Sequence, residues 1–311
     1  MVYKEKNFVS AVIYVHNAAN RIGSFLETMI DTMEENFEHS EIICVNDCSV
    51  DDSTEALKEA SKKAVSASIS ILNMSYFHGL ELSMNAGADL TIGDFVFEFD
   101  STLLDYDKSE IMKVYRRALE GYDIVSAAAD KKQRFTSKVF YHVFDHFSNM
   151  HYKMHTESFR ILSRRVINRI SSMNKFVFYR KAVYANCGLK TDMIIYQPIA
   201  CEYVSDKAEQ KYRKQLAVDA LIMFTDMGYR FSITMTFLMM LMSVFMIAYS
   251  LVTYLTRNPV AGWTTTILFL SVTFLGLFGI LTIIIKYLQL ILKLVFNRKR
   301  YNFESIEKLT R

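Results

Sequence analysis

The chain has 311 residues, of which 51% are hydrophobic and 22% are charged, and its formal net charge is +3. A net charge this small gives no indication of nucleic acid as a partner. The four cysteines have neither zinc-site nor disulfide spacing. The length is greater than most single domains need, so we expect a sizeable core.

Short apolar runs alternate with helical patterns over the first part of the chain. Helices are predicted between the strands, for example at residues 54–64 and 80–91, because apolar residues recur at helical spacing or N-cap residues precede the segment. Strands that alternate with helices indicate an α/β fold with a mostly parallel, doubly wound sheet. The strands are predicted at Phe8–Val15, Glu41–Asp47, Ser68–Met74, Asp94–Asp100 and Tyr122–Ala129.

Polar side chains follow three of these predicted strands. Asn17 comes after the first, Asn46 and Asp47 end the second, and Asp100 and Thr102 follow the fourth. In a doubly wound sheet, ligands bind beyond the carboxyl ends of the strands, so we expect these side chains to line one crevice. A capping or turn role for each of them is the alternative.

Aromatic and aliphatic side chains between residues 135 and 147 fall on one stripe of a predicted helix. Such a stripe is commonly part of a core. The alternative is a helix that lies in the membrane interface and holds the preceding domain against the bilayer.

Two uncharged apolar runs follow, at residues 231–256 and 258–285. A helix needs about 20 apolar residues to cross a bilayer, and both runs exceed that length. We therefore predict two transmembrane helices. Gly276 and Gly279 in the second run permit close helix packing, which keeps a homo-oligomer open as an alternative.

Basic residues indicate the orientation of this hairpin. Only Arg257 lies between the two runs, whereas Arg230 precedes the first and five lysines and arginines lie between residues 286 and 300. The positive-inside rule then predicts that both termini are cytoplasmic. We expect a cytosolic domain at residues 1–229, a hairpin in the plasma membrane at 230–285 and a basic cytoplasmic tail at 286–311.

The chain contains, in the order found in family 2 glycosyltransferases, the segments SAVIYVHNAANRI, EIICVNDCSVDDST, GLELSMNAGADLTIGDFVFEFDS and ESFRILSRRVINRI. These segments look most like the polyprenyl-phosphate branch of that family, and the resemblance covers most of the chain. It implies a GT-A fold. It also implies inverting transfer of a sugar from a nucleotide sugar, with a uridine diphosphate donor favoured, to a polyprenyl phosphate on the cytoplasmic leaflet.

The resemblance assigns roles to individual residues. It implies that Asp100 binds Mg²⁺ or Mn²⁺, and that Arg160 and Arg164 face the phosphates. Glu98 and Thr102 are further candidate metal ligands, and Glu98 has pairing with an arginine as its alternative. The residues expected to hold the nucleotide sugar are Asn17, Asn46, Asp47, Asp51, Asp100 and Thr102.

Several positions depart from the family pattern. Thr102 stands where the family has the second acid of the metal motif, and Asn46 stands where it has the first acid after the second strand. The segment Tyr76–Gly79 reads YFHG, where the family has RNFG. These departures keep a second hypothesis open, in which the protein has the fold of a glycosyltransferase but acts without catalysis, as a scaffold that binds lipid phosphate or a partner membrane protein.

Overall fold

The computed structural model describes residues 4–130, 156–172, 179–185, 187–199, 227–257, 260, 262–295 and 303–308. The chain divides into two compact units. We call Met1–Leu216 together with Arg298–Arg311 the sheet unit, and Ala217–Asn297 the hairpin unit. The helix predicted around residues 135–147 lies outside the described residues.

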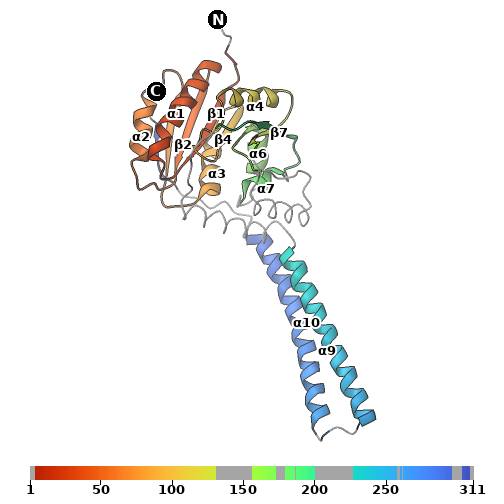
Figure 1. The fold of residues 1–311 in the computed structure, drawn as a ribbon. Helices are drawn as coiled ribbons and strands as arrows, with labels where there is room; N and C mark the ends of the chain where they lie inside the picture. Colours follow the sequence, from red (N-terminus) through yellow and green to blue (C-terminus); the bar gives the residue numbers. More distant parts are fainter. Residues whose placement is uncertain are drawn as a thin grey trace. The chain divides into compact units, whose positions relative to one another are not determined.

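The described part of the sheet unit contains one eight-stranded sheet, in the order β7-β5-β6-β4-β1-β2-β3-β8 (Figure 1). Neighbouring strands are parallel, except that β6 is antiparallel to β4 and β5, and β8 is antiparallel to β3. The predicted α/β fold with a mostly parallel sheet is confirmed. The strands are β1 (Val9–Val15), β2 (Ser40–Asn46), β3 (Ser68–Met74), β4 (Phe95–Phe99), β5 (Ile124–Ala129), β6 (Phe159–Ser163), β7 (Thr191–Tyr196) and β8 (Phe303–Lys308).

Helices cover both faces of this sheet. They are α1 (Ala19–Asn36), α2 (Ser53–Ser61), α3 (Leu80–Leu90), α4 (Ser109–Leu119), α6 (Arg164–Ser172) and α7 (Arg180–Ala185). Apolar residues of α1, α2 and α4 form one core with Phe97 and Phe99 of β4. On the other face α3 lies close to the sheet, because a side-chain carbon at Gly87 would be 2.5 Å from Val12 and 2.6 Å from Val45. Only glycine allows that approach.

The five strands predicted from the sequence agree with β1–β5 to within a residue or two at their ends. Strands β6, β7 and β8 were not predicted from the sequence. Strand β6 has only five residues and α6 begins at the next residue. The helical pattern of α6 therefore obscures the short strand in the sequence. Strand β8, with the sequence FESIEK, carries three charged residues and lies at the edge of the sheet.

The hairpin unit consists of α9 (Met227–Arg257) and α10 (Trp263–Val295) in its described residues. Both helices are long and apolar enough to cross a membrane, over Arg230–Thr256 and Trp263–Leu288. In the most apolar window of each, only 17% and 6% of the residues are buried, so neither is covered as the core helix of a soluble domain is.

The two helices of the hairpin pack along a stripe of small hydroxyl residues. Thr236, Ser243 and Ser250 are buried and lie seven residues apart on α9, a spacing that keeps them on one face of the helix. The Ser250 hydroxyl donates to the carbonyl oxygen of Thr264 on α10 at 3.3 Å. Small residues at this stripe allow close helix packing.

The unit boundaries differ from the predicted domains. Helix α10 continues to Val295, well past the predicted end of the hairpin at residue 285. The predicted basic tail at 286–311 is divided, because its residues 303–308 form β8 and pair with β3 in the sheet unit. The sheet unit ends at Leu216 rather than at residue 229.

Candidate functional site

The carboxyl ends of β1, β2, β3 and β4 lie at one edge of the sheet, because these strands are parallel. Asn17 follows β1, Asp47 and Asp51 follow β2, and Asp100 follows β4. The expected convergence of these side chains on one edge therefore agrees with the structure.

Asn17 joins the loop after β1 to the loop after β2. Its backbone is left-handed, with φ of 46°, and its N–H donates to Ser49 Oγ at 3.1 Å. Its side-chain oxygen accepts a hydrogen bond from the Val50 N–H at 2.9 Å. Asn46 supports the same loop, since its Oδ1 accepts a hydrogen bond from the Ser49 N–H at 3.1 Å. Asn17 is exposed, so a ligand at this edge of the sheet can reach it.

Asp47 is completely buried and fixes the loop after β3. Its Oδ1 accepts a hydrogen bond from the His78 N–H at 2.8 Å, and its Oδ2 accepts one from the Gly79 N–H at 2.8 Å. The Tyr14 hydroxyl donates to Oδ2 at 3.0 Å. The predicted contact between Asp47 and the nucleotide stays a prediction. We assign Asp47 to positioning the loop.

Asp51 also holds backbone groups in place. Its Oδ2 accepts a hydrogen bond from the Ala19 N–H at 3.0 Å, at the start of α1, and its Oδ1 accepts one from the Ser53 N–H at 3.2 Å. Partial burial acts to raise the pKa of Asp51, but these hydrogen bonds and that from the Ser53 hydroxyl outweigh it and lower the pKa. Asp51 is exposed, so its predicted contact with the nucleotide stays a prediction.

A buried group of charged side chains surrounds the carboxyl end of β4. Glu98 and Asp100 alternate with Phe97 and Phe99, so their side chains lie on the opposite face of the sheet from the core of α1 and α4. Glu98 pairs in register with Arg160 of β6. We call the following residues the ion cluster: Glu81, Glu98, Asp100, Glu157, Arg160 and Arg180.

Glu98 is enclosed within the ion cluster. Its side chain is 0% exposed, and its Oε2 lies 3.0 Å from Arg160 Nη1 and 2.8 Å from Arg180 Nη1. Its Oε1 accepts a hydrogen bond from the Tyr184 hydroxyl at 2.7 Å. Pairing with arginine, the alternative considered from the sequence, is therefore what the structure shows, and the assignment of Glu98 as a metal ligand is corrected.

Asp100 lies between the two guanidinium groups. Its Oδ2 accepts a hydrogen bond from Arg160 Nη2 at 2.7 Å, and its Oδ1 accepts one from Arg180 Nη2. Burial acts to raise the pKa of Asp100, but Arg160, Arg180 and Lys181 outweigh it and hold the pKa well below its usual value. Of the four carboxylates in the cluster, that of Asp100 is the most exposed, at 15%, against 11% for Glu157, 6% for Glu81 and 0% for Glu98.

Arg180, Glu81 and Tyr184 belong to the site but were not predicted. The Arg180 side chain is 1% exposed, and its Nε and backbone N–H both donate to Glu81 Oε2, at 3.1 Å and 2.8 Å. Burial raises the pKa of Glu81, although Arg180 acts in the opposite direction. The available signal was an arginine and a lysine inside the otherwise apolar and aromatic stretch FYRKAVYA. A buried arginine requires nearby anions.

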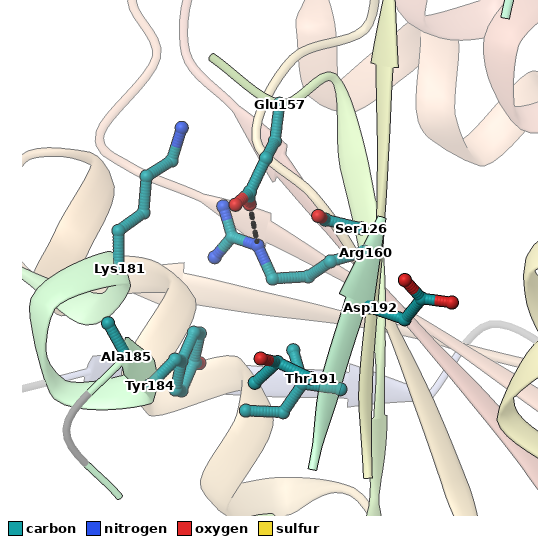
Figure 2. Close-up of a pocket in the computed structure, with 9 residues that line it drawn as sticks. Ser126, Glu157, Arg160, Lys181, Tyr184, Ala185, Thr191 and Asp192 are labelled. Carbon is teal, nitrogen blue, oxygen red and sulfur yellow. Dashed lines mark hydrogen bonds and ion pairs between the residues drawn. The ribbon is translucent and has the colours of Figure 1, made fainter. Parts of the chain in front are cut away.

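A small cavity lies beside Arg160, between α7 and strands β5, β6 and β7 (Figure 2). Figure 2 shows the Glu157 carboxylate against the Arg160 guanidinium, with Lys181 and Tyr184 projecting from α7. The cavity is large enough for a water molecule.

Thr102 lies two residues beyond Asp100 and is 6% exposed. It places a neutral hydroxyl at the position where the family has a second carboxylate. Its predicted contacts with the metal and with the nucleotide stay predictions. Farther along the same loop, Asp105 Oδ1 accepts a hydrogen bond from the Tyr196 hydroxyl at 2.8 Å. Tyr196 also contacts Ser158 Oγ.

Arg164 lies beside the amino end of β4, at the opposite end of the strands from Asp100. Because β6 is antiparallel to β4, Phe159 pairs with Phe99 near the site, whereas the chain reaches Arg164 beside the first residues of β4. Its Nε donates to the carbonyl oxygen of Gly93 at 2.8 Å. The predicted contact of Arg164 with the phosphates is corrected by this position, and the neighbouring Arg165 lies 3.8 Å from Asp123 at the same end.

The ion cluster has a formal excess of negative charge, because it contains four carboxylates and two guanidiniums. In the described part of the chain, no three or more histidine, cysteine or acidic side chains are arranged to hold a metal ion by themselves. Asp100 fits a Mg²⁺ or Mn²⁺ that takes its other ligands from substrate phosphates and water. The charge of such an ion would also offset the excess.

Comparison with known proteins gives one family match and several relatives. The profile described as glycosyl transferase family 2 matches residues 10–179. An uncharacterized glycosyltransferase of Synechocystis sp. is 28% identical over 196 residues, which are 60% of this chain and 60% of the relative. The chain thus spans less than two thirds of the length of that relative.

Two relatives have names that include a lipid carrier. The undecaprenyl-phosphate 4-deoxy-4-formamido-L-arabinose transferase of Pseudomonas syringae is 33% identical over 127 residues, 40% of this chain and 37% of the relative. The prophage bactoprenol glucosyl transferase homolog of Escherichia coli is 28% identical over 195 residues, 60% of this chain and 62% of the relative. Both belong to the polyprenyl-phosphate branch that the sequence motifs predict.

Among solved structures, glucosyl-3-phosphoglycerate synthase from Mycobacterium tuberculosis, in complex with Mn²⁺, uridine diphosphate and phosphoglyceric acid, has a TM-score of 0.49 at 13% identity. The match covers 70% of this chain and 78% of that chain.

Proposed function

The chain belongs to glycosyl transferase family 2, and we propose that it transfers a sugar from a nucleotide sugar to a polyprenyl phosphate, with inversion at the anomeric carbon. The observation that carries the proposal is Asp100, held at the carboxyl end of β4 between the Arg160 and Arg180 guanidiniums. Relatives named for undecaprenyl phosphate and bactoprenol, together with the two apolar helices, favour a lipid phosphate as the acceptor. The uridine diphosphate donor remains the one favoured by the family resemblance.

The donor is proposed to lie across the strand ends. Asn17, exposed in the loop after β1, contacts the nucleotide, while Asp47 and Asn46 hold the loops around it. The diphosphate lies near Asp100 and the two guanidiniums. Asp100 would hold a Mg²⁺ or Mn²⁺, which would supply positive charge to offset the charge of the leaving diphosphate. Arg160 and Arg180 supply positive charge to the same region.

The acceptor explains why the site needs no strong general base. A polyprenyl phosphate is already ionised, so its oxygen can attack the sugar without a side chain first removing a proton. Ser158, next to Glu157, contacts the Tyr196 hydroxyl and so has a structural partner. The family pattern has an acid at the position of Ser158, and a serine there is compatible with a phosphate acceptor, which needs no general base.

We also place the hairpin in the plasma membrane, with the sheet unit and both termini in the cytoplasm. The support is the distribution of basic residues, with Arg257 between the spans and five lysines and arginines at residues 286–300. This orientation puts the strand ends in the compartment that contains nucleotide sugars.

The test uses the purified full chain in detergent with undecaprenyl phosphate, Mn²⁺ and a panel of radiolabelled nucleotide sugars. Label that enters the organic phase from one donor is expected, and Asp100→Ala is expected to abolish it. Asp31→Ala is the matched control, because it removes a carboxylate of the same type from the surface of α1, where Asp31 pairs with Lys63. Circular dichroism shows whether each variant is folded.

Two results would contradict the proposal. Absence of labelled lipid from every donor, with folded protein, would favour the noncatalytic scaffold. Full transfer by Asp100→Ala would remove Asp100 from the reaction and leave the family assignment intact.

A further inference from the structure

The two oxygens of the Asp100 carboxylate contact two different cations. Oδ2 accepts from Arg160 Nη2 at 2.7 Å and Oδ1 accepts from Arg180 Nη2. A divalent cation that binds this carboxylate is repelled by both guanidiniums at close range. Binding of the cation therefore favours movement of one guanidinium away from Asp100.

Arg160 is the more firmly held of the two. It lies on β6 in the interior of the sheet, and its remaining nitrogens have partners of their own, since Nε donates to Glu157 at 2.9 Å and Nη1 to Glu98 at 3.0 Å. Each of its three nitrogens thus has a carboxylate, and movement of Arg160 would break contacts with all three acids.

Arg180 also has a carboxylate at each of its three side-chain nitrogens, Glu81 at Nε, Glu98 at Nη1 and Asp100 at Nη2, but the contact at Nη1 is not a hydrogen bond. Its Nη1 lies 2.8 Å from Glu98 Oε2 and forms an ion pair there, and no hydrogen-bond partner is found for Nη1 among the described residues. Arg180 begins α7, a helix of six residues, rather than lying within the sheet. A buried donor without a directed hydrogen bond is uncommon and calls for a physical reason.

We propose that Arg180 exchanges one anion for another when the donor binds: in the free protein it holds Asp100, and in the donor complex it holds a phosphate oxygen of the nucleoside diphosphate. This inference rests on the proposed function, since it takes a nucleoside diphosphate as the ligand. Released from Asp100, Arg180 keeps Glu81 at Nε and Glu98 at Nη1, but its buried Nη2 then lacks an acceptor and needs another one. The planar guanidinium matches phosphate oxygens in geometry and charge.

The exchange predicts how the free protein treats the metal. While Arg180 occupies Asp100, the free protein binds Mn²⁺ weakly, and the nucleotide strengthens that binding. By linkage, Mn²⁺ strengthens nucleotide binding by the same factor. Because the nucleotide itself supplies ligands to Mn²⁺, this coupling alone does not identify Arg180. The Mn²⁺ affinity of the nucleotide-free protein does.

The experiment titrates the full chain in detergent with Mn²⁺ and follows free Mn²⁺ by electron paramagnetic resonance, without nucleotide and with uridine diphosphate. Arg180→Gln is expected to bind Mn²⁺ without nucleotide about tenfold more tightly than the wild type, and uridine diphosphate less tightly, so the coupling shrinks. Arg116→Gln is the matched control: it removes a guanidinium from an exposed position on α4 and should match the wild type.

Arg180→Lys keeps the positive charge but not the planar fork, so it is the second variant if Arg180→Gln does not fold; it should change both affinities in the same directions by less. Two outcomes overturn the exchange: a wild type that binds Mn²⁺ equally well with and without uridine diphosphate, or a folded Arg180 variant whose nucleotide-free Mn²⁺ affinity is unchanged. The transfer assay separates this inference from the proposed function. Transfer with unchanged Mn²⁺ affinity refutes only the exchange, and altered affinity without transfer refutes only the reaction.

Discussion

Asp47→Asn tests whether the buried carboxylate after β2 positions the loop or binds the nucleotide. The carboxylate accepts hydrogen bonds from the N–H groups of His78 and Gly79 and from the Tyr14 hydroxyl. The asparagine side chain keeps one accepting oxygen and places an amide group where the other oxygen was. At least one of the two backbone N–H groups then faces a donor instead of an acceptor.

The expected loss follows from these contacts. A buried donor left without an acceptor costs about 1–3 kcal/mol, and a hydrogen bond to a neutral oxygen is weaker than one to a carboxylate. We therefore expect the loop to lose about 3 kcal/mol of local stability, which corresponds to roughly 100-fold faster exchange of the His78 and Gly79 amide hydrogens.

Hydrogen exchange read by mass spectrometry on peptides that cover residues 75–80 measures this change. Tryptophan fluorescence is unsuitable, because the single tryptophan, Trp263, lies in the hairpin unit. Asp52→Asn is the control, since Asp52 is exposed and makes no side-chain cap to α2. Unchanged exchange in Asp47→Asn, with a lower affinity for uridine diphosphate, would refute the positioning role and favour a direct contact with the nucleotide.

Three further predictions concern other parts of the sheet unit. Cys48 is exposed in the loop after β2, whereas burial raises the pKa of Cys44 to about 12. An alkylating reagent at neutral pH should therefore label Cys48 and spare Cys44, and uridine diphosphate should slow the labelling of Cys48. Peptide mass spectrometry measures both effects. Arg164→Gln should lower stability by about 1–2 kcal/mol, because it removes the hydrogen bonds to the Gly93 carbonyl, yet calorimetry should find its affinity for uridine diphosphate unchanged; a lost affinity would place Arg164 back in the site. The pKa of Asp100 is lower in the folded protein than in the unfolded chain, where it is about 3.9, so the stability it provides is present above that pH and is lost as the pH falls through the folded value. Asp100→Asn should therefore lower the melting temperature at neutral pH and differ less from the wild type in acid, and a constant difference across the pH range would contradict this.

Strands β1–β5 were predictable because buried strands of a parallel sheet are runs of apolar residues with turn residues after them. The position of the site followed from the same pattern, since the carboxyl ends of parallel strands meet. Strand β8 was not predictable, because its alternating charged sequence resembles a solvated tail until β3 is known to lie beside it.

The roles of single side chains were harder to predict than their location. Asp47 and Asp100 both follow apolar strands, but only three-dimensional contacts distinguish the first, which holds backbone N–H groups of a loop more than 30 residues away, from the second, which meets guanidiniums. Arg180 and Asp100 are 80 residues apart in the chain. Nothing local in the sequence indicates that they are in contact.

Strand β8 also makes the order of synthesis matter for this fold. The six residues Phe303–Lys308 leave the ribosome after both apolar helices, yet they cover the edge of β3. Until then, the N–H and C=O groups along that side of β3 have no strand to pair with, and such an edge invites pairing with other chains. The sheet is therefore completed only after the hairpin has been synthesised. A chain that stops before residue 303 exposes β3 as an unpaired, aggregation-prone edge strand, even though its first 216 residues are intact.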